Sequence, residues 1–215
     1  MRRRRSLIPL WLKIVYTLFM LLVIPVYWRA YGPADFLWFC DVAAILTIVA
    51  LWRENSLLAS MSAVAMTLPQ TAWIIDFLTG GRVVGVARYM FDPGVPLYVR
   101  GLSTFHLWLP FLLLWMVSRL GYDRRALACQ IALSTAVLIA SYALTDPRKI
   151  DPRQPPAYPA AAVNVNRVYG PEPKNVQTRI PELAYLAIEI VFWPVVFYMP
   201  THWVFRQVFR RRSRG

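Results

Sequence analysis

The fold class of this 215-residue chain is decided by residues 7–28, LIPLWLKIVYTLFMLLVIPVYW. Lys13 is the only charged residue in this stretch. As a helix the stretch would extend for about 33 Å at 1.5 Å per residue, which exceeds the roughly 30 Å hydrocarbon core of a bilayer. The stretch therefore predicts a membrane-spanning helix.

Five further apolar stretches follow along the chain, at residues 36–52, 56–78, 102–120, 126–144 and 181–205. Their ends carry Trp, Tyr or Arg, as expected where side chains meet lipid headgroups. The second span is short and the last is long. We therefore expect an all-α, six-helix transmembrane bundle that residues 1–215 form as a single domain.

The composition argues against a soluble enzyme. Hydrophobic residues make up 58% of the chain and charged residues only 16%, whereas soluble domains have about 25% charged residues. The net charge of +13 would suggest a nucleic-acid partner, but many of the arginines lie at Arg2 to Arg5 and within 206–214, beside apolar stretches. At those positions we expect contacts with anionic lipid headgroups and no nucleic-acid partner.

Basic residues also predict the orientation in the membrane. With six spans both termini lie on one side, and the segments on that side carry more than half of the 24 Lys and Arg residues. The opposite segments are much longer, and long loops count for little in the positive-inside rule. Both termini are therefore expected to be cytoplasmic. We expect the first span to be retained, because its apolar run is too long for a signal peptide.

Polar side chains inside the apolar stretches are candidates for function, because they are costly in lipid. On the expected orientation they converge on the outer half of the bundle, which predicts a cavity open to the outer side. The alternative is that they reach the headgroups from near the helix ends. The set comprises Cys40, Asp41, Gln70, Asp76, His106 and Glu189.

Cys40 and His106 are predicted to lie at similar depths, about one turn below the outer surface. A thiol and an imidazole can act as nucleophile and general base. Asp41 or Asp76 could then orient the histidine. The alternative is structural, because a single Cys in a helix is usually a small apolar residue.

The outer loop 145–180 is rich in proline and contains Asn164 and Asn166. These asparagines are predicted either to bond a lipid headgroup or to cap their own turn, and Gln70 or Asn166 could donate to an oxyanion. The other Cys and His, Cys129 and His202, are expected near the inner ends of their spans. This separation argues against a disulfide or a metal site, and no cofactor is expected.

The order of these features resembles the bacterial YwaF-type membrane proteins. The residues that carry the resemblance are Cys40-Asp41, Trp52, Gln70, Asp76, Phe105-His106 with Leu109-Pro110, and Asn166 with Tyr169-Gly170. YwaF-type proteins are similar to the transmembrane glycerophospholipid acyltransferases and, more remotely, to the androgen-induced lipid hydrolases of animals. Trp38 and Phe39 stand where a polar residue often precedes the Cys-Asp pair, and the Pro-rich loop is a further departure.

The resemblance implies a six-helix enzyme of the bacterial inner membrane that transfers or cleaves fatty acyl groups. It places Cys40 at the nucleophile position and His106 at the histidine position. Our leading hypothesis is a lipid acyltransferase or acyl-ester hydrolase, with the other polar residues contributing to substrate binding. The alternative is a non-catalytic membrane protein, either a small transporter using Asp41, Asp76 and Glu189 or a subunit or oligomer in a membrane complex.

Overall fold

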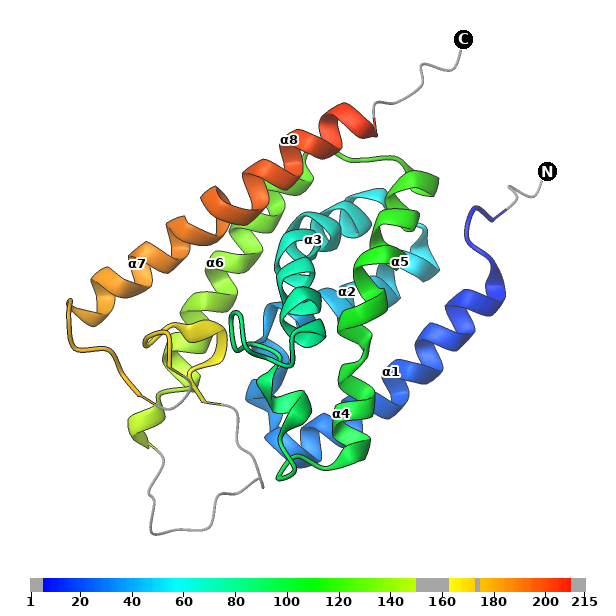
Figure 1. Cartoon of the computed structure of the whole chain (residues 1–215). Coiled ribbons are helices and arrows are strands. Elements are labelled where there is room, and N and C mark those ends of the chain that lie inside the picture. The colour runs from blue at the N-terminus through cyan, green and yellow to red at the C-terminus, as the bar shows by residue number, and fades with distance from the viewer. Residues whose placement is uncertain (1–5, 150–162, 173–174, 210–215) are drawn as a thin grey trace.

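The computed structural model describes residues 6–149, 163–172 and 175–209 (Figure 1), and within these ranges every regular element is helical. The prediction of an all-α chain is therefore confirmed. The α-helices are α1 (Leu10–Tyr31), α2 (Phe39–Arg53), α3 (Ser56–Leu78), α4 (Leu97–Ser103), α5 (Phe105–Leu120), α6 (Ala126–Leu144), α7 (Glu182–Trp193) and α8 (Met199–Val208). Short helical turns are η1 (Pro33–Leu37), η2 (Arg88–Phe91), η3 (Pro147–Lys149), η4 (Val165–Arg167) and the π-helical η5 (Pro194–Tyr198).

Five helical segments are long and apolar enough to cross a membrane. They agree with five of the six predicted spans: the bounds of 56–78 are the same, and the other four differ by a few residues at one or both ends. The third segment joins α4 and α5, and the last joins α7, η5 and α8. These segments are Leu10–Tyr31, Ser56–Leu78, Leu97–Leu120, Ala126–Lys149 and Glu182–Val208. The chain thus has the helices of an integral membrane protein.

The remaining predicted span, 36–52, is a shorter helix than the others. α2 has 15 residues and is therefore about 22 Å long. It begins only at Phe39, because Trp38 has non-helical backbone angles, φ −57° and ψ 135°, after the short turn η1. The sequence pattern of apolar residues did not reveal this break.

The contacts of Glu54 define how α1 and α2 are arranged. Glu54 follows the end of α2, yet its carboxylate accepts hydrogen bonds from Lys13 and Ser6 at the start of α1. Therefore α2 runs back along the bundle to the level at which α1 begins. We call this end of the bundle the Glu54 end, and the opposite end, which contains η1, the Asp35 end.

The turn between α5 and α6 and the last helix also reach the Glu54 end. The backbone N–H of Asp123 donates to Ser60 Oγ near the start of α3 at 3.0 Å. Tyr122 bonds His202 of α8. The start of α1 and the end of α8 accordingly lie on the same side of the molecule (Figure 1).

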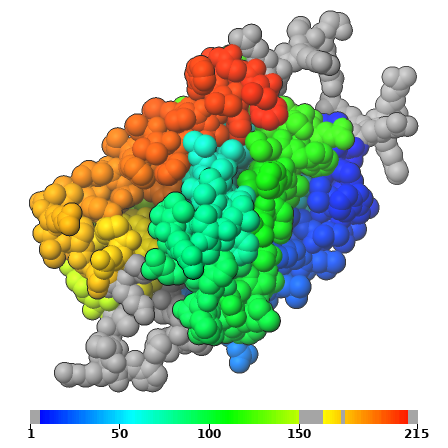
Figure 2. Space-filling model, in the orientation of Figure 1, coloured from blue at the N-terminus to red at the C-terminus, as the bar shows by residue number. Residues whose placement is uncertain are grey.

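α3 is the central helix of the bundle. Its first half is an unbroken buried run from Ala59 to Met66, in which Ala and Ser predominate. Small residues let neighbouring helices approach closely in membrane proteins. Figure 2 shows α3 between α5 and the α7–α8 segment. Of the most apolar window of α3, 56% is buried, compared with 17% for Glu182–Val208, so the C-terminal segment presents most of its surface outward.

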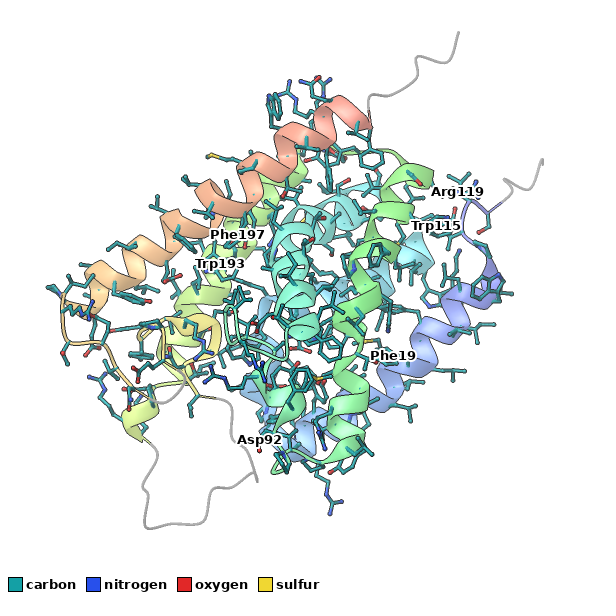
Figure 3. The ribbon with its side chains drawn as sticks, in the orientation of Figure 1. Phe19, Asp92, Trp115, Arg119, Trp193 and Phe197 are labelled. Atoms are coloured by element: carbon teal, nitrogen blue, oxygen red, sulfur yellow. The ribbon has the colours of Figure 1, made fainter. Side chains whose placement is uncertain are left out.

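The C-terminal segment contains a π-helical turn at Pro194–Tyr198. Pro194 lacks the N–H of an ordinary helical residue, and single π turns inside α-helices are often found at such positions. Tyr198, the last residue of this turn, is fully buried. The rings of Trp193 and Phe197, labelled in Figure 3, have centroids 5.0 Å apart.

The Glu54 carboxylate is expected to stabilise the fold in a pH-dependent way. Burial alone would raise its pKa, but bonds from Lys13, Ser6 and the backbone N–H groups of Leu7 and Ile8 lower it to about 2. This contribution should be fully present above about pH 4.5 and lost as the pH falls toward about 2. Glu54→Gln should reduce the free energy of unfolding at pH 7 by about 1–3 kcal/mol.

Thermal unfolding in detergent at a series of pH values would measure this effect. Glu172→Gln provides a matched control, because Glu172 is an exposed glutamate elsewhere in the chain. An equal loss of stability in both variants would contradict a specific role for Glu54.

Candidate functional site

A group of polar side chains lies inside the Asp35 end of the bundle. The group combines residues of α1, α2 and α5 with the two short elements η1 and η2 and with the end of α4. We call it the outer polar cluster, and its members are Tyr27, Asp35, Cys40, Asp41, Tyr89, Ser103 and His106.

Ser103 connects Tyr27 to His106 within this cluster. The Ser103 hydroxyl donates to the carbonyl of Val99 at 3.1 Å, so the Tyr27 hydroxyl, 2.6 Å away, must donate to Ser103 Oγ. The carbonyl of Ser103 lies 2.8 Å from His106 Nδ1. Ser103 therefore fixes both side chains through different atoms.

The Ser103 carbonyl is available because the helix breaks next to it. In a continuous helix, the N–H of Leu107 would bond the carbonyl of Ser103. Here that N–H instead donates to the carbonyl of Thr104 at 2.9 Å, between α4 and α5. The break thus supplies a backbone acceptor for the imidazole.

This contact determines the tautomer of neutral His106. A carbonyl oxygen can only accept, so Nδ1 carries the proton and donates it. In the neutral ring, Nε2 then has a free lone pair and can act as a base. The buried Trp73 ring stacks on His106 with a centroid distance of 4.7 Å and an angle of 22°. The neighbouring Phe105 ring also contacts it, with a centroid distance of 4.1 Å, so one hydrogen bond and two aromatic contacts fix the ring orientation.

Cys40 and two carboxyl groups form the other side of the cluster. The Cys40 thiol donates to Asp41 Oδ2 at 3.4 Å. Asp35 lies within electrostatic range of both residues. Asp35 and Asp41 are 6% and 4% exposed, and neither is in an ion pair among the described residues. Burial raises the pKa of Asp35 to about 7, and the Trp38 side chain offsets this only in part.

Tyr89 brings the loop after α3 into the same cluster. Its hydroxyl lies beside the side chains of Ser103 and Trp73 and within electrostatic range of Cys40 and Asp41. Burial raises the pKa of Tyr89, so at neutral pH it is an uncharged O–H donor. Tyr27 is likewise within electrostatic range of Cys40 and Asp41. The two tyrosines therefore bridge the cysteine side and the histidine side.

Cys40 and His106 are connected within this cluster only through Tyr27, Tyr89 and Ser103, since their own hydrogen bonds run to Asp41 and to the Ser103 carbonyl. Asp41 and Asp76 were both candidates to orient the histidine. In the structure the Ser103 carbonyl takes this position at Nδ1. A direct contact between the thiol and the imidazole remains a prediction.

Asn166 holds the junction between η1 and α2. Its Oδ1 accepts from the N–H of Phe39 at 3.1 Å, and its Nδ2 donates to the carbonyl of Leu37 and to Ser141 Oγ at 2.7 and 3.2 Å. The side chain therefore caps the first turn of α2 at Phe39, the residue that precedes Cys40. All these contacts support the structural alternative for Asn166.

Asn164 organises its own loop. Its Oδ1 accepts from the N–H of Tyr169, and its Nδ2 donates to the carbonyls of Gly170 and Glu172. The residue is fully buried and has a left-handed backbone with φ 48°, which asparagine tolerates better than most residues. The geometry again favours the turn-capping interpretation over headgroup binding.

Asp76 binds the loop that follows α3. Its Oδ1 accepts from the N–H groups of Val83, Val84 and Gly85, and its Oδ2 accepts from that of Ala87 at 2.7 Å. These bonds occupy both oxygens and place the loop so that Tyr89 follows. Asp76 thus contributes to the cluster by positioning η2.

Gln70 and Glu189 have fewer contacts than the other predicted residues. Gln70 is 2% exposed; its Nε2 approaches Met66 Sδ at 3.8 Å, and its Oε1 has no protein partner among the described residues. Glu189 accepts from Trp193 Nε1 at 3.1 Å, one turn away on the same helix. A role for either residue in substrate binding stays a prediction.

Four members of the outer polar cluster were missed by the sequence analysis: Tyr27, Asp35, Tyr89 and Ser103. Tyrosines are common at membrane interfaces, so Tyr27 and Tyr89 gave no sign of a site. Asp35 lies one residue before a predicted span. The sequence Gly32-Pro33-Ala34-Asp35 could have indicated Asp35, because a Gly-Pro pair beside an acidic residue predicts a structured turn.

The described residues contain no group of three His, Cys, Asp or Glu side chains with the spacing of a metal site. Comparison of the chain with models of protein families, with curated proteins and with solved structures found no match.

The raised pKa of Asp35 predicts an opposite pH dependence to that of Glu54. A carboxyl whose pKa rises from 3.8 to about 7 on folding binds its proton more tightly in the folded state. Stability should therefore be greatest below about pH 4 and fall as the pH rises to about 7. Asp35→Asn should flatten this part of the pH profile of thermal unfolding, whereas Asp92→Asn, at an exposed turn of the same end, should retain it.

Asp76→Ala should detach the loop from α3. Four backbone N–H groups would lose their acceptor, at a cost of about 3 kcal/mol or more. Hydrogen–deuterium exchange should then rise at residues 83–89, while exchange in α6 stays as in the wild type. Unchanged protection of 83–89 would contradict the assigned role.

Proposed function

We propose that the chain crosses the bacterial inner membrane six times, with the Glu54 end in the cytoplasm. α2 together with η1 extends from the Asp35 end to the Glu54 end, which supports a sixth crossing despite the short helix. Its buried face, including Ala43, Ala44, Thr47 and Leu51, packs inside the bundle. Neighbouring helices therefore cover much of its length, and a full match to the lipid thickness is less important for α2.

We further propose that the outer polar cluster is an acyl-transfer or acyl-hydrolysis site. The observation that carries this proposal is the hydrogen bond from His106 Nδ1 to the Ser103 carbonyl, which leaves Nε2 as a base in the cluster that contains Cys40. The resemblance to YwaF-type proteins implies the same reaction class. The substrate class is a lipid ester or thioester that enters from the outer leaflet.

In the proposed reaction, His106 Nε2 takes the proton of the Cys40 thiol as Sγ attacks the acyl carbonyl carbon. The carbon–oxygen bond of the ester then breaks, and the proton on Nε2 passes to the departing alcohol. Water or a second alcohol next attacks the Cys40 thioester while His106 Nε2 takes its proton; the carbon–sulfur bond breaks, and this proton returns to Cys40 Sγ, which releases a fatty acid or a new ester. Binding of the substrate is required to turn the thiol from Asp41 toward His106.

A donor for the developing oxyanion would come from Tyr89 in the cluster or from one of two amides outside it. The Nδ2 of Asn166 is already bonded to Leu37 and Ser141, so Gln70 is the better of the two amides predicted for this role. Tyr89 offers an uncharged hydroxyl near Cys40. A preorganised donor of this kind stabilises the transition state in a site that excludes water.

A proton-coupled transporter is the second candidate. It is favoured by the two carboxyls Asp35 and Asp41, which are buried within electrostatic range of each other at one end of the bundle. Buried acidic residues inside membrane proteins commonly bind and release protons during transport. This function would require Asp35 and Asp41 but not the thiol.

The test compares the lipids of membranes that contain equal amounts of the wild type, Cys40→Ala, His106→Ala and Cys129→Ala. Cys129 is the second free cysteine and lies near the start of α6, away from the outer polar cluster. The acyl-chain change produced by the wild type should fall by at least about 100-fold in the first two variants. Cys129→Ala should retain it, and mass spectrometry of the lipids gives the measurement.

A folded wild type that changes no lipid would refute the enzyme. Proton flux into proteoliposomes that survives Cys40→Ala but is lost in Asp35→Asn and Asp41→Asn would instead establish the transporter.

A further inference from the structure

A second group of polar residues lies at the opposite end of the bundle, where the α5–α6 turn meets α8. The Tyr122 hydroxyl is 2.5 Å from His202 Nδ1, and the two ring centroids are 5.6 Å apart. Phe205 packs edge-on against Tyr122 with a centroid distance of 5.5 Å. Tyr122 is 6% exposed, so this contact is a fixed part of the structure and not a surface encounter.

The hydrogen bond orients the donor atom of His202. Burial raises the pKa of Tyr122, whereas Arg206 lowers it to a smaller extent, so the hydroxyl stays protonated. When this hydroxyl donates to Nδ1, the neutral imidazole must carry its own proton on Nε2. The Tyr122–His202 pair thereby presents an N–H donor away from Tyr122.

Two arginines lie within electrostatic range of His202. Arg206 follows His202 by four residues and lies on the same face of α8. Arg124 comes from the α5–α6 turn, and both guanidinium groups are exposed and within electrostatic range of His202. The nearest acidic side chain in the turn, Asp123, accepts a two-point ion pair from Arg125 at 3.1 and 2.8 Å.

The position of the group fits the membrane interface. Trp203, next to His202, is 64% exposed, and an exposed Trp at a helix end is typical of the headgroup level. Arg119 lies over the ring of Trp115 at 5.6 Å at the same end of the bundle, as Figure 3 shows. Aromatic and basic side chains thus share the level at which lipid phosphates would lie.

We propose that Arg124, His202 and Arg206 form a binding site for the phosphate group of an anionic phospholipid in the cytoplasmic leaflet. Two guanidinium groups and one imidazole N–H can each donate to a different phosphate oxygen, and arginine suits this bonding because its planar group donates in pairs. The site depends on the proposed orientation of the chain but not on chemistry at Cys40. It gives the expected contact with anionic headgroups a defined location.

Native mass spectrometry of the full-length protein released from nanodiscs would test the site. The nanodiscs contain phosphatidylcholine with or without phosphatidylglycerol, and the variants are Arg124→Gln, Arg206→Gln and the double variant. Arg29→Gln is the matched control, because Arg29 is equally exposed but lies at the Asp35 end. Each substitution in the site should weaken phosphatidylglycerol retention about five-fold, as expected for one basic residue at an anionic surface.

The Tyr122→Phe variant tests the role of the hydrogen bond. It keeps the ring against Phe205 but leaves His202 without its fixed partner, so retention should fall while the thermal unfolding temperature changes little. The proposal is overturned if Arg29→Gln reduces retention as much as Arg206→Gln, because binding would then follow total charge. It is also overturned if all variants retain phosphatidylglycerol equally.

A final measurement distinguishes a lipid from a free anion. Inorganic phosphate is added to the protein in phosphatidylcholine nanodiscs, and thermal unfolding is followed. No stabilisation is expected, because Trp203 and the helix end favour a ligand held at the membrane surface. Stabilisation that disappears in Arg206→Gln would overturn the lipid assignment in favour of free phosphate.

Discussion

The structure depends on the rule that a backbone N–H or C=O group entering hydrocarbon must find a partner inside the protein. Continuous helices meet this rule by themselves. Where a helix stops, side chains must bond the backbone groups that it leaves free. The N–H of Phe39, at the start of α2, is satisfied by Asn166 from a loop 127 positions away in the chain. The Ser103 carbonyl, left free between α4 and α5, is satisfied by the His106 side chain. Both breaks thus bring polar side chains into the same end of the bundle.

This rule also explains why several predicted ligand-binding residues have structural contacts. Asp76 accepts four N–H groups of a loop that could not otherwise enter the bundle, and Asn164 bonds three backbone groups of its own loop. Such side chains are expensive to bury unless they are fully bonded. Once bonded, they fix the path of the chain, and this path places Tyr89 near Cys40. They contribute to the candidate site by building it, whereas the groups with remaining capacity for chemistry are Cys40, Asp35, Asp41 and His106 Nε2.

The sequence predicted the helices well because apolar runs of membrane length are a direct physical signal. It also predicted that Cys40, Asp41 and His106 lie toward one end, because counting residues along a helix gives depth. It could not predict the rotation of each helix, so Tyr27 and Ser103 were not recognised as links between the two sides. The late start of α2 at Phe39 was missed, since Trp38 and Leu37 are as apolar as the helix that follows them. Asn166 was predicted either to bind substrate or to cap its own turn, and its contact with Phe39 was not predicted because the two residues are far apart in sequence.

The two ends of the bundle differ in charge, and this difference connects the topology with both proposed sites. At the Asp35 end the outer polar cluster contains two carboxyls, a thiol, two tyrosines and an imidazole, and among the described residues none of these groups is in an ion pair. At the Glu54 end, Arg124, His202 and Arg206 surround a tyrosine, an environment suited to a permanent anion. On the proposed orientation, the positive-inside rule puts the cationic end against the anionic cytoplasmic leaflet. On that orientation the outer polar cluster faces the other leaflet, where an uncharged ester group would meet Cys40 and His106.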